Sequence, residues 1–360
     1  MSTLKVDSIE NSGSAVNFPN NVQAGDGFAK REYTSSATAP SGANNGALWW
    51  DTVNEELNLK IAGFWYVVDA NLPIPWYGSR GLTQGSSADQ DAIVYITIAT
   101  PGNSTAFGNL TVARYYSCAL SNGTRGVFGP GSPAGGGTAN NTLDYVTIAT
   151  TGNATDFGDA ATTGYGQTGL SNGTTGVFAG SYISPGNQMH YITVASTGNS
   201  TDFGDLTVGR GDAAGCGSAS RGLIGGGNAT AGGKSNVIDY ITIATPGNAT
   251  DFGDLTLARS GLCSAGSDTR AVFAAGNSGS NSNVIDYVAI ATAGNATDFG
   301  DCTTSRQYRS AMSDISRLVI AGGQSTNIME YITIATPGNG TDFGDLSASD
   351  FQGNAGCSGT

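Results

Sequence analysis

One phrase recurs six times along the chain, and this repeat constrains the fold more than any other feature. Its clearest copy is Asp239-Tyr-Ile-Thr-Ile-Ala-Thr-Pro-Gly-Asn-Ala-Thr-Asp-Phe-Gly-Asp-Leu-Thr256. Every copy places a phenylalanine twelve residues after a tyrosine, and the tyrosines are Tyr95, Tyr145, Tyr191, Tyr240, Tyr287 and Tyr331. These tyrosines are 50, 46, 49, 47 and 44 residues apart. A period in this range is typical of repeat architectures, including four-stranded propeller blades.

Each unit has a part of constant length and a part of variable length. The step from tyrosine to phenylalanine is always twelve residues, whereas the remainder of the unit has 32 to 38. Runs of β-branched and aromatic residues between glycine-rich turns predict four short strands per unit. Because each sheet must cover the apolar face of its neighbour, six units predict a ring. We therefore expect an all-β fold, a six-bladed β-propeller over residues 76–360.

The two ends of the repeat region predict how the ring closes. Residues 350–360 contain an inner strand and a turn but no second strand, and Gly78–Gly85 forms a second strand with no inner strand before it. We expect the last segment of the chain to complete the blade that the first repeat begins.

Composition excludes several classes of protein. The net charge is −13, and only 12% of the 360 residues are charged, which argues against nucleic-acid binding because phosphates require clustered Lys and Arg. No apolar stretch reaches the ~20 residues of a membrane span. The first ten residues lack the apolar core of a signal peptide. Five cysteines without C-x-x-C spacing argue against a disulfide framework or a zinc site, and favour synthesis in a reducing cytoplasm.

Residues 1–75 lie outside the repeat and are rich in aromatic residues. Ala47–Thr52, Leu57–Ile61 and Gly63–Asp69 predict a small hairpin or meander. Because a sheet this short needs a partner surface, we interpret the segment as an attachment or oligomerisation element. The aromatic residues proposed for attachment are Trp49, Trp50, Phe64, Trp65 and Tyr66.

Two resemblances follow from these motifs. The opening Thr3-Leu-Lys-Val-Asp-Ser-Ile9, the segment Gly46-Ala-Leu-Trp-Trp-Asp-Thr52 and the repeated phrase resemble parts of tail-fibre and other virion proteins of tailed phages, especially those of marine bacteria and cyanobacteria. The order of strands, with Gly226-Gly227 after the second strand and Tyr240 in the third, also resembles Kelch repeats. Phe252 stands where Kelch repeats have tryptophan, so "Kelch-like" describes the repeat better.

The resemblance to virion proteins implies a function and a set of partners. It implies a tail-fibre or adhesion component, made in the cytoplasm of a bacterial host and located in the virion. Its propeller would bind a host-surface glycan or protein, or other virion proteins, and similar fibres are commonly homotrimers. The competing hypothesis is a purely structural capsid-decoration or tail-connection protein. A carbohydrate-active enzyme is a remote third.

The variable connections carry the candidate binding residues. In a propeller the second-to-third and fourth-to-first connections emerge on one face, and binding sites concentrate in variable loops on a rigid scaffold. Arg and Tyr dominate recognition sites. The candidates on this face are Arg114, Tyr115, Tyr116, Tyr182, Arg210, Arg259, Arg306 and Tyr308. The alternative is that these arginines cap strand ends and pair with nearby aspartates.

No residue pattern nominates a catalytic centre or a resident cofactor. Five copies carry an aspartate pair such as Asp251 and Asp254, whereas catalysis needs one asymmetric constellation. We interpret the pairs as turn caps, with a structural calcium site as the alternative. The only histidine, His190, has no His or Cys partner nearby in sequence. We therefore expect a protein that is not an enzyme and holds no cofactor.

Overall fold

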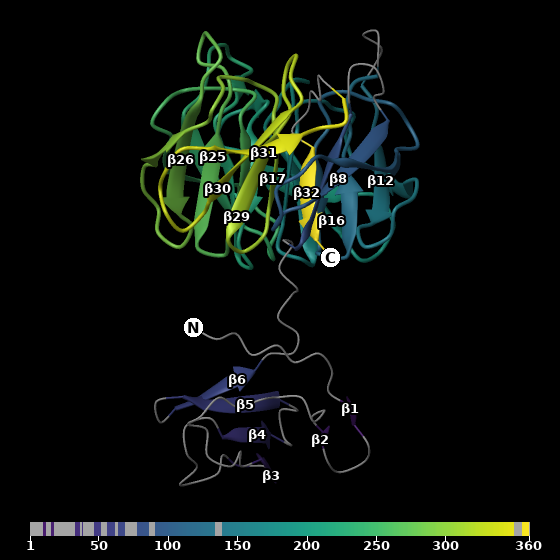
Figure 1. Ribbon diagram of the computed structural model, residues 1–360, viewed down its shortest axis with the longest axis vertical. Coiled ribbons are helices and arrows are strands. Elements are labelled where there is room, and N and C mark those ends of the chain that lie inside the picture. Colours follow the sequence, from purple (N-terminus) through teal and green to yellow (C-terminus); the bar gives the residue numbers. More distant parts are fainter. Residues whose placement is uncertain are drawn as a thin grey trace. The chain divides into compact units, whose positions relative to one another are not determined.

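The computed structural model describes residues 78–85, 91–133, 139–348 and 355–359 throughout. Earlier in the chain it describes residues 10–11, 16–17, 33–36, 38, 47–51, 56–61 and 64–68. Contacts divide the chain into two units, Met1–Leu72 and Pro73–Thr360. The described residues form strands and no helix (Figure 1), so none of them forms a helix able to span a membrane.

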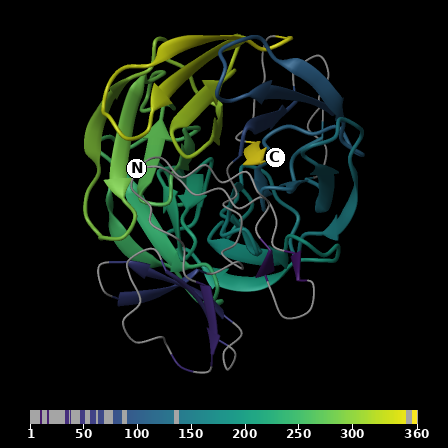
Figure 2. The ribbon, with the colours of Figure 1, turned by 60° about the horizontal axis from the view of Figure 1, so that its bottom comes forward.

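The second unit is a six-bladed β-propeller, as the sequence predicts (Figure 2). Each blade is a four-stranded antiparallel sheet, numbered here from the innermost strand outward. The first blade contains β32 (Gly356–Gly359), β7 (Arg80–Gln84), β8 (Ala92–Thr97) and β9 (Thr105–Asn109). The second contains β10 (Ala119–Ser121), β11 (Arg125–Phe128), β12 (Thr142–Thr147) and β13 (Thr155–Asp159). The third contains β14 (Thr168–Ser171), β15 (Thr175–Ala179), β16 (Gln188–Thr193) and β17 (Thr201–Asp205).

The remaining three blades repeat this arrangement. The fourth contains β19 (Ala214–Gly217), β20 (Arg221–Gly225), β22 (Val237–Thr242) and β23 (Thr250–Asp254). The fifth contains β24 (Cys263–Gly266), β25 (Arg270–Ala274), β26 (Val284–Ala289) and β27 (Thr297–Asp301). The sixth contains β28 (Ser310–Ser313), β29 (Arg317–Ala321), β30 (Ile328–Thr333) and β31 (Thr341–Asp345). A two-residue ladder joins β18 (Arg210–Gly211) to β21 (Asn228–Ala229).

The ring closes through the last strand of the chain. β32 pairs antiparallel with β7, so the first blade combines one carboxy-terminal strand with three from the start of the repeat region. Ser358 ties this strand to both neighbouring blades. Its Oγ donates to the carbonyl oxygen of Ser313 at 2.7 Å, and its own carbonyl accepts from Ser121 Oγ at 2.6 Å. The predicted closing strand is therefore confirmed.

The constant twelve-residue step builds the outer half of each blade. It joins two antiparallel strands across a seven-residue connection, 243–249 in the fourth blade. The register shifts between Ile238 and Asp239, just before the tyrosine, and leaves Phe252 as the extra residue of a β-bulge. The step brings the tyrosine ring edge-on to the phenylalanine ring: Tyr240 and Phe252 have centroids 6.1 Å apart at 74°. All six blades repeat this edge-to-face pair, at 5.8 to 6.1 Å. The constant length therefore preserves an aromatic contact and a hairpin register.

The same turn also joins each blade to the one before it. The side-chain oxygen of Asn199 accepts from the backbone N–H of Asp159 at 3.0 Å, and the N–H of Gly198 donates to the carbonyl of Phe157 at 2.7 Å. The asparagine contact recurs at all six junctions, including the one from Asp345 to Asn103 that completes the ring. These asparagines, which match a glycosylation sequon, are thus inter-blade hydrogen-bond acceptors.

Close approach of the blades explains a glycine in the phrase. Gly158 has φ of +136°, and a Cβ there would lie 2.6 Å from the backbone of Gly198 in the next blade. A side chain would therefore clash with the neighbouring turn and strain its own backbone.

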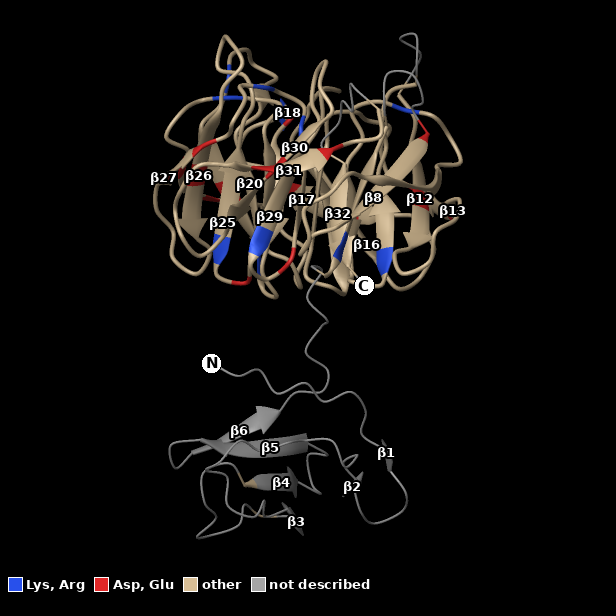
Figure 3. Cartoon of the chain, viewed as in Figure 1, with Lys and Arg blue, Asp and Glu red and all other residues tan. Residues whose placement is uncertain are grey.

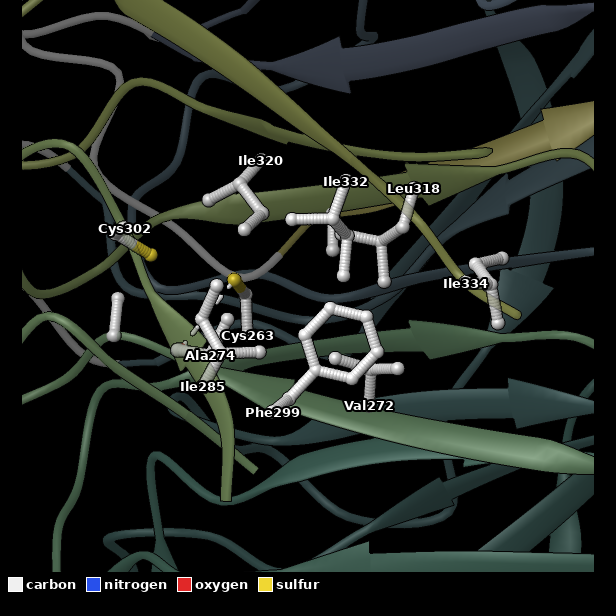
Figure 4. Close-up of a cluster of buried hydrophobic side chains, with 12 residues drawn as sticks. Cys263, Val272, Ala274, Ile285, Phe299, Cys302, Leu318, Ile320, Ile332 and Ile334 are labelled. Atoms are coloured by element: carbon white, nitrogen blue, oxygen red, sulfur yellow. Dashed lines mark hydrogen bonds between the residues drawn. The ribbon is translucent and has the colours of Figure 1, made fainter. Parts of the chain in front are cut away.

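The hydrophobic core is divided among the six junctions between blades. Figure 4 shows the cluster between the fifth and sixth blades, where Phe299, Val272 and Ile285 of one blade face Leu318 and Ile332 of the other. Five further clusters fill the other junctions. Because every blade buries both faces against neighbours, removal of one blade would expose two of these clusters.

The first unit contains a separate four-stranded sheet. In it β3 (Tyr33–Ser36) pairs in parallel with β4 (Leu48–Asp51), which continues through β5 (Glu56–Ile61) to β6 (Phe64–Val68) in antiparallel order. The meander predicted for this segment is therefore present, with β3 as an additional edge strand. A two-residue ladder joins β1 (Glu10–Asn11) to β2 (Val16–Asn17).

Candidate functional site

The variable connections of neighbouring blades meet at one end of the propeller, which we call the loop face. There the N–H of Tyr182, from a second-to-third connection, donates to the carbonyl of Tyr165, from a fourth-to-first connection. Similar backbone bonds join Ser181 to Arg210 and Gly227 to Arg259. The predicted grouping of the two kinds of connection on one face is therefore confirmed.

A row of five residues with left-handed backbone conformation lies within the loop face. Tyr116, Gly166, Asp212, Gly261 and Tyr308 occupy equivalent positions in successive connections, with φ between 49° and 68°. From Gly166 onward, each N–H donates to the carbonyl of the preceding member, at 2.7 to 2.9 Å. Glycine adopts this conformation at little cost, whereas Tyr and Asp are strained by about 1–3 kcal/mol each. Strain of this kind clusters at functional sites.

The strained positions bring tyrosines from different blades together. Rings of Tyr116 and Tyr308, from connections far apart in sequence, have centroids 5.2 Å apart in an edge-to-face arrangement. Tyr116 also neighbours Tyr115 and Tyr165, each at 6.4 Å, and Tyr165 stacks on Tyr182 at 5.4 Å. We call these five residues the tyrosine cluster. All five are partly exposed.

A buried carboxylate supports the tyrosine cluster. The hydroxyl of Tyr182 donates to Asp212 Oδ2 at 2.6 Å, and Tyr308 makes a further side-chain hydrogen bond to Asp212. Burial raises the pKa of Asp212 to about 6, and these hydrogen bonds and the charge of Lys234 oppose the shift only in part. Burial, followed by the charge of Asp212, raises the pKa of Tyr182 and of Tyr308. At neutral pH the cluster therefore presents protonated phenols around a carboxylate.

Three of the predicted binding arginines are structural. Arg114, Arg210 and Arg259 are fully buried, and their side chains pair with Asp144, Asp239 and Asp286 at 2.9, 3.1 and 2.7 Å. Their guanidinium groups bond to groups of a single blade and face no solvent, so the alternative of pairing with aspartates holds for these three.

The sixth blade also contains a buried ion pair, but its arginine stands at a different position in the repeat. Arg309 pairs with Glu330, and both side chains are fully buried. Arg306, which occupies the position equivalent to Arg114, is only partly buried, and its Nη1 donates to the carbonyl of Ser305 at 3.0 Å. Of the predicted arginines, Arg306 alone is not fully buried, and its binding role stays a prediction.

Sequence reasoning missed the carboxylates of these pairs. Asp144, Asp239, Asp286 and Glu330 each come directly before the tyrosine of the repeat, inside an otherwise apolar strand. An arginine precedes each of them by 21 to 30 residues, as the partners above show. The third blade, with His190 at the acidic position, has Gly164 in place of the arginine. This joint change was the available signal.

Further arginines, which sequence reasoning also missed, lie at the opposite end of the propeller and join its blades. The guanidinium carbon of Arg270 lies 4.3 Å from the ring centroid of Tyr287, and its Nη1 donates to the carbonyl of Ile334 in the next blade at 2.7 Å. Equivalent cation–π contacts are made by Arg80, Arg125, Arg221 and Arg317. Figure 3 shows two of these arginines as the blue ends of β25 and β29. These arginine contacts join neighbouring blades, and we call them inter-blade latches. The third blade has Thr175 at this position.

The central axis offers little room to a ligand. The inner strands enclose a cavity of about 50 Å³ lined by small residues such as Gly215, Ala265 and Ser313. This volume suits one or two water molecules. Cys216, Cys263 and Cys357 lie on inner strands and Cys118 directly precedes β10; all are buried free thiols whose pKa burial raises to about 12. They contribute packing rather than reactivity.

Other predicted sites fall partly outside what the structure describes. Trp49 and Trp50 lie on β4, and Phe64, Trp65 and Tyr66 lie on β6, but their side chains are outside the described residues. Their attachment role stays a prediction. Within the described residues no group of three or more His, Cys, Asp or Glu side chains is placed to hold a metal ion. The calcium alternative also stays a prediction.

Fold and site together define a propeller that carries an aromatic cluster with a buried carboxylate on its loop face. A scan against models of protein families finds none that matches this chain, and a search of curated proteins finds no match either.

Proposed function

We propose that the protein is a virion component of a tailed phage, a tail-fibre or adhesion subunit that binds the host surface through the tyrosine cluster. The observation that supports this proposal is the convergence of five tyrosines from four connections on the face where loop lengths vary. The resemblance of the repeated phrase and of the opening segment to tail-fibre proteins supplies the biological setting.

The chemistry of the tyrosine cluster suits recognition. Tyrosine offers a large, rigid apolar face at low cost in conformational entropy, with a hydroxyl that can donate and accept hydrogen bonds. Backbone hydrogen bonds through Gly166, Asp212 and Gly261 link Tyr116 to Tyr308 and hold the cluster at fixed positions. A site that is rigid before binding loses less entropy on association.

We propose a binding role rather than a catalytic one. The buried carboxylates Asp144, Asp239, Asp286 and Glu330 are each engaged by a buried arginine. Asp212, although its pKa is raised, is held by two tyrosine hydroxyls. A glycosidase needs two carboxylates flanking one bond, and these interactions assign the buried carboxylates to structure.

A structural virion protein is the second proposal, and one observation favours it. Exposed aspartates of the outer strands surround the propeller in five of the six blades, among them Asp156, Asp251, Asp298 and Asp342. Such a belt would suit contact with a basic surface of a capsid or tail protein. The outer belt and the tyrosine cluster are separate surfaces, so variants can distinguish the two roles.

The test uses labelled full-length protein and cells that the parent phage infects. Tyr116→Ala and Tyr165→Ala remove aromatic faces but leave the hydroxyls that bind Asp212, so the fold should be retained. Each should reduce cell binding at least tenfold in flow cytometry. Ile315→Ala, which alters an exposed residue in a first-to-second turn, is the matched control. Unchanged binding by both tyrosine variants, together with immunogold labelling of the capsid, would favour the structural role and defeat the adhesin.

A further inference from the structure

The third blade lacks the buried ion pair on which four of the six blades depend. In the second and fourth blades the arginine stem packs over a glycine. A methyl group at Gly131 would lie 3.3 Å from Cδ of Arg114, and one at Gly227 would lie 3.2 Å from Cδ of Arg210. In the third blade the equivalent residues are Gly164 in place of the arginine and Ser181 in place of the glycine. Loss of so large a side chain leaves space unless the surroundings fill it. Here Gln167 and Ser181 take up the space nearest the backbone, because a methyl group at Gly164 would lie 3.1 Å from Gln167 Nε2 and from Ser181 Oγ.

A cavity of about 280 Å³ occupies this part of the loop face. Its walls include Thr162, Thr163, Gln167, Ser181, Ile183 and Gln188, and the backbones of two glycines complete them. Thr163, Ile183 and Gln188 are exposed, so the cavity opens to solvent at its rim. Gln167 and Ser181 are buried and form its inner wall.

Buried polar atoms at this cavity lack partners within the protein. Gln167 and His190 contact each other through Nε2 atoms 3.2 Å apart, and both side chains are at least 98% buried. Gln167 Oε1 and His190 Nδ1 nevertheless have no hydrogen-bond partner, and neither does Asn187 Oδ1, next to the rim. Turning the amide of Gln167 over would satisfy its oxygen and leave its NH₂ group free instead. Buried polar groups are almost always hydrogen-bonded, so this wall is suited to a polar ligand.

The lining of the cavity selects for an uncharged ligand. It contains three hydroxyl groups, two side-chain amides, one isoleucine and no charged residue. His190 behind the wall is neutral at physiological pH because burial lowers its pKa to about 4. A charged ligand would find no counter-ion here and would lose its hydration. A wholly apolar ligand would leave the amide and hydroxyl groups unpaired.

The cavity adjoins the tyrosine cluster. Ser181 and Ile183, which line it, flank Tyr182, and the ring of Tyr182 stacks on Tyr165 at 5.4 Å. A ligand that extends from the cavity along this connection would therefore reach the tyrosine cluster. A hydroxyl-rich ring with one apolar face could form hydrogen bonds with the polar lining of the cavity and pack against the neighbouring aromatic side chains.

We propose that this cavity is a subsite for one uncharged sugar residue. The inference rests on the proposed binding function and specifies its ligand class. One sugar unit would enter at the loop-face end of the third blade and bond to Gln167 and the threonine hydroxyls. The units attached to it would lie against the tyrosine cluster.

The test titrates the full-length protein with free sugars. Glucose, galactose, mannose and N-acetylglucosamine are the uncharged probes, and glucuronic acid is the charged control. Saturation-transfer NMR should detect at least one of the uncharged sugars, and calorimetry should give its affinity. The quadruple variant G164R/Q167S/S181G/H190D copies Arg114, Ser117, Gly131 and Asp144 of the second blade, so it replaces the polar inner wall of the cavity by a buried ion pair and should still fold. Its affinity for that sugar should be at least tenfold lower.

Further variants keep the outcome decisive. Thr163→Trp blocks the exposed rim without altering the buried residues, and it should lower sugar affinity as much as the quadruple variant does. Ile315→Ala, in an exposed first-to-second turn, is the control that should leave the affinity for a free monosaccharide unchanged. Absence of binding by all four uncharged sugars, or equal binding by the quadruple variant and the native protein, overturns the subsite. Host-cell binding that persists in that case would leave the adhesin standing, whereas sugar binding without cell binding would defeat the adhesin alone.

Discussion

The buried ion pair between Arg259 and Asp286 gives the sharpest prediction about stability. Both side chains are fully buried, and Asp286 also accepts from Thr256 Oγ1 at 2.5 Å. Arg259 has one further partner, the carbonyl of Phe273 at 3.1 Å. Asp286→Leu would leave the guanidinium enclosed with that single acceptor. Breaking a buried pair in this way costs about 3–5 kcal/mol, because an uncompensated charge stays in a low-dielectric interior.

The double variant Arg259→Met with Asp286→Leu separates the charge from the packing. Replacing both partners of a buried pair by apolar residues is often neutral or stabilising. The double variant should therefore unfold within about 1 kcal/mol of wild type. Each kcal/mol corresponds to about 2 °C in Tm for a domain of this size, so the single variant should melt roughly 6–10 °C lower.

Urea unfolding and calorimetry of wild type, both singles and the double variant measure these effects. Asp298→Leu is the matched control, because Asp298 faces Asp286 across the sheet but is exposed. It should change the free energy of unfolding by less than about 0.5 kcal/mol. The reasoning fails if Asp286→Leu costs under about 1 kcal/mol, or if the double variant is as unstable as the single.

Two buried groups should make stability depend on pH in opposite directions. The raised pKa of Asp212, about 6, gives stability that is complete below the ordinary Asp pKa and is lost as pH rises through about 6. The lowered pKa of His190, about 4, gives stability that is present above the ordinary His pKa and is lost as pH falls through about 4. Urea unfolding between pH 4 and 6.5 measures both effects. As pH rises, the stability of Asp212→Asn relative to wild type should increase by about 3 kcal/mol, and that of His190→Gln should decrease by about 3 kcal/mol. Profiles that run parallel to wild type would contradict this. Gly158→Ala should cost about 1–3 kcal/mol in the same assay, because its φ and the next turn exclude a Cβ. Gly152→Ala, where no atom lies within 4 Å, should be nearly neutral, and equal effects would reject the close-approach explanation. Thr175→Arg should complete the set of inter-blade latches and stabilise the propeller by about 0.5–1 kcal/mol; an unchanged Tm in calorimetry would show that the latch contributes nothing.

Much of the scaffold could be predicted because its signals are local and repeated. The step from Tyr240 to Phe252 spans one hairpin, and a hairpin of constant length has a constant register. The incomplete blade at each end of the repeat region predicted the pairing of β32 with β7. In the first case the residues that make the contact are near in sequence. In the second they belong to two incomplete parts of one repeat unit, which together make a complete blade.

The candidate site was predicted less well, because residue type alone does not reveal burial. Arg114, Arg210 and Arg259 were predicted to meet a ligand, yet each is enclosed with a carboxylate about 30 residues later. Tyr116 and Tyr308 were predicted correctly to share a face, but not to touch. Tyr165 and Asp212 were not singled out at all.

The sequence by itself determined the number of blades, the outer hairpins and the strand that closes the ring, since these depend on spacing that repeats along the chain. Only the tertiary structure decided which charged residues are buried and which tyrosines meet. Tyr116 and Tyr308 lie in connections of different blades, and the closed ring alone brings their rings to 5.2 Å. The cavity beside Gln167 is likewise formed by separate segments of the chain, because Thr163 and Ile183, which also line it, come from different connections. Contacts around an axis depend on how blades fit together, and no single repeat contains that information.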